Sequence, residues 1–151
     1  MIKVKQWISA TFGAASVEDP AARRHARNLA VAALLVEVLR ADYDVSGPER
    51  RQVLDSIRDL LELEPAECEA LLLSAELQVD GAHDLHQFTS ELNRSLSHDD
   101  KLDLLEQLWR VAQADSTVHH YEEHLIRRVA DLLHVSHREF IVTKLRTGGG
   151  D

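Results

Sequence analysis

An internal repeat constrains the fold of this chain more than any other feature of its sequence. The segment ALLVEVLRADYDVSGPERRQVLDSIRDLLELEPAE aligns with EQLWRVAQADSTVHHYEEHLIRRVADLLHVSHRE further along the chain. The matched pairs are Leu35 with Leu108, Val38 with Val111, Asp42 with Asp115, Val45 with Val118, Glu49 with Glu122, Val53 with Ile126, Leu60 with Leu133 and, after a one-residue gap, Glu67 with Glu139. Each copy reads as a helix, a loop, a second helix, a turn and the start of a third helix. We therefore expect two related halves around a shared core, with one further helix between them.

The composition predicts an all-α fold. Hydrophobic residues make up 44% of the 151 residues, which is enough for a packed core, whereas aromatic residues make up only 5%. Leu and Ala dominate the apolar residues and favour helices, whereas strands would require more Val, Ile, Tyr and Phe. We expect a single compact domain of about seven helices, since a chain of this length forms one core.

Capping signals and apolar spacing place the predicted helices. Ser46 with Glu49 and Ser136 with Glu139 have the spacing of capping boxes, and Ser97 precedes two acidic residues that suit a helix start. Three helices are expected in the first part of the chain: about 22–42, from the turn with Pro48 to about 62, and 65–79. A short fourth helix carries Leu85, Phe88 and Leu92. The last three are expected at about 97–114, 120–134 and from 136 to just before 147. Between Asn28 and Leu39 only Asn28 and Glu37 are polar, so we expect the first helix to be central and buried.

The domain boundaries follow from the same pattern. We predict an N-terminal segment at 1–21, a helical domain at 22–146 and a flexible tail at 147–151. The opening run MIKVKQWISATF has apolar residues at helical spacing, so it could lie on a membrane or a partner, or dock on its own domain. The longest apolar run, LAVAALLV, is far shorter than the roughly 20 residues that span a bilayer. No signal-peptide pattern is present, so we expect a cytoplasmic location.

The charge distribution narrows the classes of partner. The formal net charge is −9, and residues 41–123 carry six basic and twenty acidic side chains. This acidic central segment of the sequence repels phosphate, which argues against nucleic-acid binding. It suits cations or basic protein surfaces, or it serves only solubility. We expect a protein partner, and a homodimer is compatible with the sequence. Cys68 is the only cysteine, which excludes a disulfide framework and a cysteine-based zinc site.

The first acidic loop has the residues of an oxygen-ligand cation site. Four of its residues match positions one, three, five and six of an EF-hand loop: Asp42, Asp44, Ser46 and Gly47. The match then fails, because position eight is Glu49 and position twelve is Val53 instead of a bidentate glutamate. Glu49 could supply the third carboxylate from another direction, together with Asp42 and Asp44. The simpler alternative is that Glu49 only caps its helix.

The second loop retains two of these carboxylates and adds histidines. Asp115 and Glu122 occupy the positions of Asp42 and Glu49. His120 and His124 are spaced i, i+4 on one helix face, and such a pair can hold zinc or nickel. We expect no obligatory cofactor; if an ion binds, calcium or magnesium is favoured over zinc. An Asp at a helix C-terminus faces the negative end of the helix dipole, so a cation or loop amides should compensate it.

Catalytic motifs are lacking in the sequence. There is no HExxH pattern and no Glu followed three residues later by His, which argues against a zinc protease or a di-iron centre. The His98–Asp99 dipeptide lies within the predicted Ser97 cap. We expect no enzymatic activity. The alternatives are a metal-dependent hydrolase, which ligation by His83 and His86 near the second loop would support, and a membrane-peripheral adaptor that uses the N-terminal segment.

The two loops also carry a resemblance to a known family. In each copy an AD dipeptide ends a helix, a Val follows three residues after the Asp, a Glu follows seven after it, and an apolar residue lies four beyond the Glu. This pattern resembles the TerB-like family, named for tellurite resistance. The run from Val111 to Phe140 is similar to the second half of a stand-alone subgroup, and the resemblance covers about 22–145. The family usually has Gly after the motif Asp, where this chain has Tyr43 and Ser116.

The resemblance implies a compact all-helical domain with an acidic cluster in its loops. It further implies a role in tellurite and chemical-stress resistance or in a co-chaperone, a function in binding an ion or a partner, and no established catalytic activity. Residues with L side chains adopt a left-handed turn at a cost that Gly does not incur, so the loop geometry is expected to differ from the family's usual one.

Overall fold

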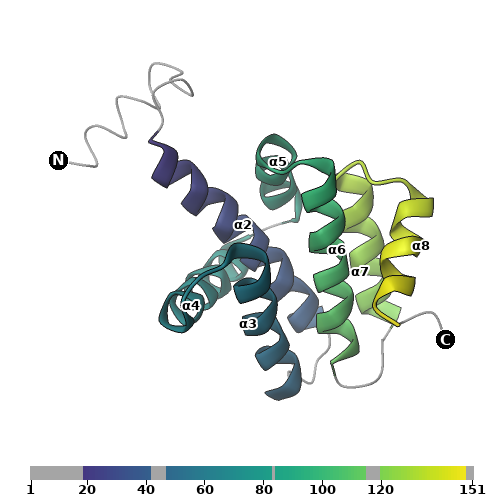
Figure 1. Ribbon diagram of the computed structural model, residues 1–151, viewed down its shortest axis with the longest axis horizontal. Coiled ribbons are helices and arrows are strands. Elements are labelled where there is room, and N and C mark those ends of the chain that lie inside the picture. The colour runs from purple at the N-terminus through teal and green to yellow at the C-terminus, as the bar shows by residue number, and fades with distance from the viewer. Residues whose placement is uncertain (1–18, 42–46, 83, 115–119, 149–151) are drawn as a thin grey trace.

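The protein is an all-α structure. The computed structural model describes residues 19–41, 47–82, 84–114 and 120–148, and within these ranges it contains seven helices and no strand. The helices are α2 (Pro20–Ala41), α3 (Gly47–Leu61), α4 (Pro65–Gly81), α5 (His86–Ser95), α6 (His98–Gln113), α7 (His120–Leu132) and α8 (His137–Arg146) (Figure 1). The predicted fold class is therefore confirmed. The opening run MIKVKQWISATF lies outside the described residues.

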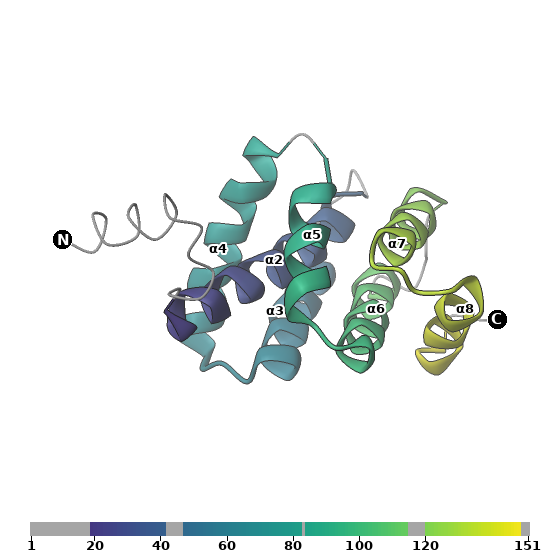
Figure 2. The same cartoon turned by 90° about the horizontal axis from the view of Figure 1, so that it is seen from above.

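Helix α2 is the centre of the molecule. Its side chains from Ala30 to Val36 are all buried, as is Leu39, which confirms the prediction of a central helix. It packs against α3, α4, α5, α6 and α7, and Figure 2 shows it running between α4 and α5. A helix that is apolar on most of its faces is stable only when other elements surround it. Helices α3 to α7 accordingly surround α2, and α8 packs against α6 and α7.

The second half of the chain forms a three-helix unit of α6, α7 and α8. The fully buried indole of Trp109 on α6 packs against Phe140 on α8, with ring centroids 5.4 Å apart and planes inclined by 47°. Helix α5 joins this unit to the first half, since it contacts both α2 and α7. The side-chain amide of Asn93 on α5 donates a 2.9 Å hydrogen bond to the carbonyl of Leu132. The prediction of a helix between the two halves is thus confirmed.

Side-chain caps hold several helix starts. The Ser97 hydroxyl accepts a hydrogen bond from a backbone N–H at the start of α6, and Ser136 forms a capping box with Glu139 at the start of α8. Both caps were predicted. Helix α4 also begins with a capping box, between Glu64 and Glu67. Each cap satisfies backbone amides that have no partner within the helix.

The repeat extends to the backbone conformation at the helix ends. Glu62 follows α3 with φ of 55°, and His134 follows α7 with φ of 63°. These are the only non-glycine residues with positive φ in the described part of the chain. At α7 the backbone N–H of Val135 donates to the carbonyl of Ala130, which completes a Schellman C-cap. The left-handed residue explains why α7 ends at Leu132, before the predicted end at His134.

None of the helices in the described ranges has the length and apolar character needed to cross a membrane.

Candidate functional site

The two acidic loops connect helix ends that lie at the same end of the molecule. Helices α2 and α6 end there, and α3 and α7 begin there, at the bottom of Figure 1. Helix α2 packs against α3, α6 and α7, so these ends belong to one packed unit. The predicted ligands Asp42, Asp44 and Asp115 lie outside the described residues. Ser46, the expected partner of Glu49 in a capping box, lies outside them as well.

The two predicted glutamates are completely buried. Glu49 in the first turn of α3 and Glu122 in the first turn of α7 both have 0% of their surface exposed. Most glutamates remain at the protein surface, and a fully buried one is rare unless its charge is compensated. The repeat thus places one buried carboxylate at the start of each second helix.

This burial follows from the phase of the apolar pattern. Val53 and Ile57 lie four and eight residues after Glu49, so all three side chains share one face of α3. Both apolar side chains are fully buried. Ile126 stands in the same relation to Glu122 on α7. A Glu in phase with a core stripe is therefore a signal for burial, and it was available from the sequence.

Burial of a carboxylate has a large energetic cost. The effective penalty for removing such an ion from water is several kcal/mol, whereas a helix N-terminus contributes at most about 2 kcal/mol in favourable, partly buried geometries. The helix dipoles of α3 and α7 therefore compensate only part of the cost at Glu49 and Glu122. The remainder must come from hydrogen-bond donors or positive charge at this end of the molecule.

Ion pairs fix the helix ends that flank the site. Arg50 in α3 donates a 2.8 Å hydrogen bond to Glu76 on α4. Arg40 near the end of α2 pairs with Asp80, also on α4. These contacts attach both helix ends around the first loop to the same neighbouring helix. The site is thus framed by packed elements, which is what a preorganised binding site requires.

The start of α7 is held in a similar way. The Lys144 ammonium on α8 donates a 2.6 Å hydrogen bond to Glu123. This bond is the main cause of a lowered pKa at Glu123, and burial of the carboxylate opposes it. Glu123 therefore stays ionised and fixes α7 against α8, beside the buried Glu122.

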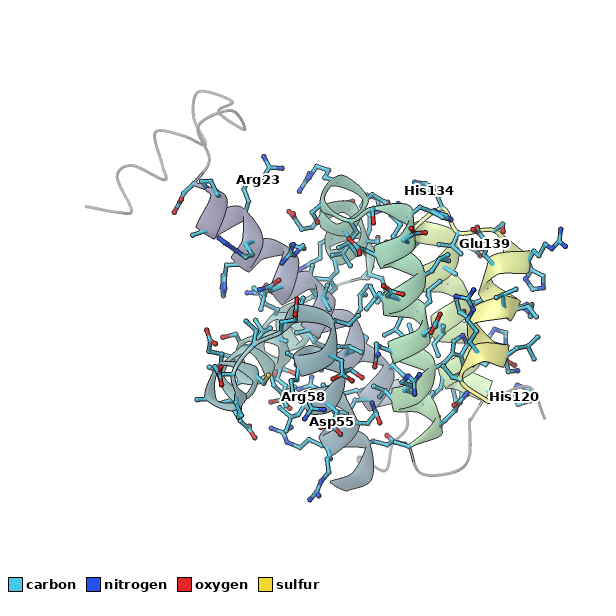
Figure 3. All side chains as sticks on the ribbon, in the orientation of Figure 1. Arg23, Asp55, Arg58, His120, His134 and Glu139 are labelled. Carbon is cyan, nitrogen blue, oxygen red and sulfur yellow. The ribbon has the colours of Figure 1, made fainter. Side chains whose placement is uncertain are left out.

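The predicted histidine pair is exposed. The rings of His120 and His124 have centroids 6.4 Å apart and lie on one face of α7, as their spacing indicated. Figure 3 shows His120 at the lower end of the second half. Across the described ranges, no three His, Cys, Asp or Glu side chains are grouped closely enough to hold a metal ion. The described residues near this pair therefore offer at most two ligands.

Other histidines that suggested chemistry have structural contacts. His98 lies in the first turn of α6 after the Ser97 cap, and its Nε2 is 2.7 Å from the Glu139 carboxylate on α8. His86 contacts the hydroxyl of Ser90, four residues further along α5, at 3.1 Å. His83 lies outside the described residues.

An acidic groove of about 450 Å³ lies between α2, α3 and α6. Its carboxylates are Asp59, Glu62, Asp100, Asp103 and Glu106, and among the described residues Arg27 is the one basic side chain that lines it. Burial raises the pKa of Asp103, and the neighbouring carboxylates of Glu106 and Asp100 raise it further. The sequence did not reveal this groove, because its acids come from helices that are distant in the chain.

Comparison with known protein families gives one match. A family model described as "Tellurite resistance protein TerB" matches residues 28–145, which is more than half of the chain and includes both halves of the repeat. Comparison with curated proteins and with solved structures gives no match.

Proposed function

The chain belongs to the TerB family, and from this membership together with the paired buried glutamates we propose that it is a binding module whose acidic end holds a divalent cation. Glu49 and Glu122 would supply one carboxylate from each half of the repeat. Asp42, Asp44 and Asp115 are the further proposed ligands, from the loops beside them.

The observation that carries this proposal is the complete burial of both glutamates. A cation between the two helix starts would offset the cost of burying two carboxylates at the same end of the molecule. Calcium and magnesium prefer oxygen ligands, and every proposed ligand of this set is a carboxylate. We therefore favour these ions over zinc. Zinc or nickel would instead select the exposed pair of His120 and His124.

We propose a function in binding and not in catalysis. The polar side chains that could suggest a reaction have structural contacts: the Ser97 hydroxyl caps α6, and His98 contacts Glu139. The family's name points to tellurite resistance, and we propose that this chain acts in a cytoplasmic response to chemical stress through a bound ion or partner. A metal-dependent hydrolase on the same helices is the alternative, and ligation by His83 or His86 would support it.

A basic protein surface is a second candidate ligand. The acidic groove between α3 and α6 favours it, because five carboxylates face one guanidinium there. Burial and neighbouring carboxylates raise the pKa of Asp103, which reflects a negative potential in this groove. Such a potential attracts a positively charged partner and speeds its association.

Calorimetric titration of the metal-stripped full chain with calcium, magnesium, zinc and nickel tests the proposal. Saturable binding of calcium or magnesium is expected, and Glu49→Gln and Glu122→Gln should each weaken it at least tenfold. Glu69→Gln, at an exposed glutamate on α4, is the matched control and should bind as the wild type does. Binding of zinc or nickel alone, abolished by His120→Ala with His124→Ala, would move the site to the histidines. The absence of any binding would contradict the cation proposal.

Thermal unfolding separates ligation from simple helix capping. In chelator, Glu49→Gln should unfold at about the same temperature as the wild type, because the ion that the carboxylate would bind is absent from both proteins. Added calcium or magnesium should stabilise only the wild type. If Glu49→Gln is instead less stable in chelator, internal donors compensate the carboxylate and the glutamate is a structural group.

A further inference from the structure

Exposed apolar side chains gather on two helices. In the described part of the chain, the exposed large hydrophobic residues are Leu73, Leu77, Tyr121, Ile141, Val142 and Leu145. All of them except Tyr121 belong to α4 or α8. Single exposed apolar residues are common on proteins, whereas clusters on one helix face indicate an interaction surface.

Helix α4 has an exposed apolar stripe opposite its buried face. Leu73 is 56% exposed and Leu77 is 72% exposed, and they lie four residues apart. The exposed Ala66 and Ala70 extend the stripe at spacings of three and four residues. Of the other described helices, α4 contacts mainly α2 and α3 on its inner side, so its outer face is uncovered there.

Helix α4 itself contributes only acidic charge beside the stripe. It carries Glu67, Glu69, Glu76 and Asp80 and no basic residue, although Glu76 and Asp80 pair with arginines of α3 and α2. Glu69 beside the stripe is exposed and forms no ion pair within the described ranges. Two such faces would repel one another, so pairing of α4 with α4 is disfavoured. The face fits an apolar partner surface with basic charge.

Helix α8 presents a surface of that kind. Ile141, Val142 and Leu145 are 36%, 40% and 57% exposed. Together with Arg138 they occupy positions i, i+3, i+4 and i+7, which form one stripe along the helix. Arg138 is exposed and has no ion-pair partner among the described residues, and Arg146 lies beside the stripe.

The two faces lie on opposite sides of the molecule. Figures 1 and 2 both place α4 at one side of the helical layer and α8 at the other. The α8 surface of one chain therefore cannot cover the α4 surface of the same chain. It can cover that of a second copy.

We propose that α8 of one copy docks on α4 of a second copy, with Ile141 against Leu73, Leu145 against Leu77 and Arg138 near Glu69. Because the two docking faces differ, the contact is heterologous. Each added copy leaves one α4 face and one α8 face open, so association continues into chains unless the geometry closes a ring. The cation site proposed above takes no part in it.

The association should be weak and salt-dependent. One helix face on another buries less than the roughly 1,200 Å² of a stable interface, so a dissociation constant on the order of 100 µM is expected. The facing charges are exposed and should be screened by salt. Self-association should therefore increase with protein concentration and decrease when salt is raised.

Sedimentation velocity of the full chain, from about 10 µM to 1 mM, tests the proposal. The wild type should form species larger than a dimer at high concentration. Leu77→Lys blocks the α4 face and Leu145→Glu blocks the α8 face, so each variant alone should remain monomeric. An equimolar mixture of the two retains one intact face of each kind and should form heterodimers and nothing larger. Tyr121→Lys, an exposed apolar residue on α7, is the matched control and should associate as the wild type does.

A charge exchange tests the register. Glu69→Arg and Arg138→Glu should each weaken association at least fivefold, and the double variant should recover most of it. A wild type that stays monomeric at 1 mM would overturn the proposal. Dimers formed by Leu145→Glu alone would overturn it too, because they would indicate a symmetric α4 interface.

Discussion

His98 in the first turn of α6 and Glu139 in the first turn of α8 are joined by a 2.7 Å contact between the imidazole Nε2 and the carboxylate Oε2. The other carboxylate oxygen accepts hydrogen bonds from the backbone N–H and the hydroxyl of Ser136, at 3.2 and 3.0 Å. Glu139 thus caps α8 and also connects it to α6 through His98. The bond to His98, and then the bonds to Ser136, lower the pKa of Glu139.

This lowered pKa predicts a loss of stability in acid. A glutamate in the unfolded chain has a pKa of about 4.3. Since folding lowers it, the stabilisation is fully present above that pH and is lost as the pH falls through the lower native value. The wild type should therefore lose its advantage over Glu139→Gln as the pH falls below about 4.3 and through the lower native pKa. Urea denaturation at stepped pH measures this, and a difference that stays constant with pH would contradict it.

Lys144 should stabilise the second half through two contacts. Its ammonium lies 5.3 Å from the centroid of the Trp109 ring and donates to Glu123. Lys144→Met retains the apolar stem but removes both contacts, so it should lower the free energy of unfolding by about 1 kcal/mol. Glu123→Gln removes only the ion pair and should cost less. Chemical denaturation of both variants provides the measurement, and equal losses would leave no role for the contact with the indole.

Replacing Asp103 should stabilise the protein at neutral pH. Burial and adjacent carboxylates raise the pKa of Asp103, so its ionised form opposes folding. Asp103→Asn should increase the free energy of unfolding by about 0.5 kcal/mol at pH 7, since the partly exposed site is screened by solvent. The gain should vanish as the pH falls below about 3.9, where the unfolded carboxyl is protonated too. Glu69→Gln is the control; a gain of the same size there would assign the effect to net charge.

The left-handed residue after α7 should favour glycine. His134 is exposed and has φ of 63°, a conformation that costs a residue with a side chain about 1 kcal/mol. His134→Gly should therefore raise the free energy of unfolding by about 0.5–1 kcal/mol. Arg128→Gly, at an exposed position inside the same helix, should lower it by about 1 kcal/mol. Equal losses in both variants would show that His134 has stabilising contacts that outweigh the backbone strain.

Most of the helical fold could be predicted from local signals. Ser97 and Ser136 mark helix starts because a hydroxyl satisfies free amides wherever a helix begins, whatever its tertiary surroundings. The apolar character of α2 on most faces likewise required a central position. Such signals act over a few residues, so the sequence alone reveals them.

Features that depend on residues distant in the sequence could not be predicted from local signals. The acidic groove brings Asp59 of α3 beside Asp103 of α6, and nothing local to either helix indicates that they meet. The burial of Glu49 could have been inferred from its phase with Val53, but capping offered a sufficient local explanation. The carboxylates of Asp42, Asp44 and Asp115 lie outside the described residues, so that part of the predicted site stays a prediction.

The position of α2 has a consequence for how the molecule unfolds. Although the sequence is a repeat, α2 belongs to the first half and packs against α6 and α7 of the second. Expressed alone, either half would expose the apolar surface that the other covers, so neither should be an autonomous folding unit. The two halves should therefore unfold in a single cooperative transition. A destabilising substitution in either half should lower the unfolding temperature of the whole domain.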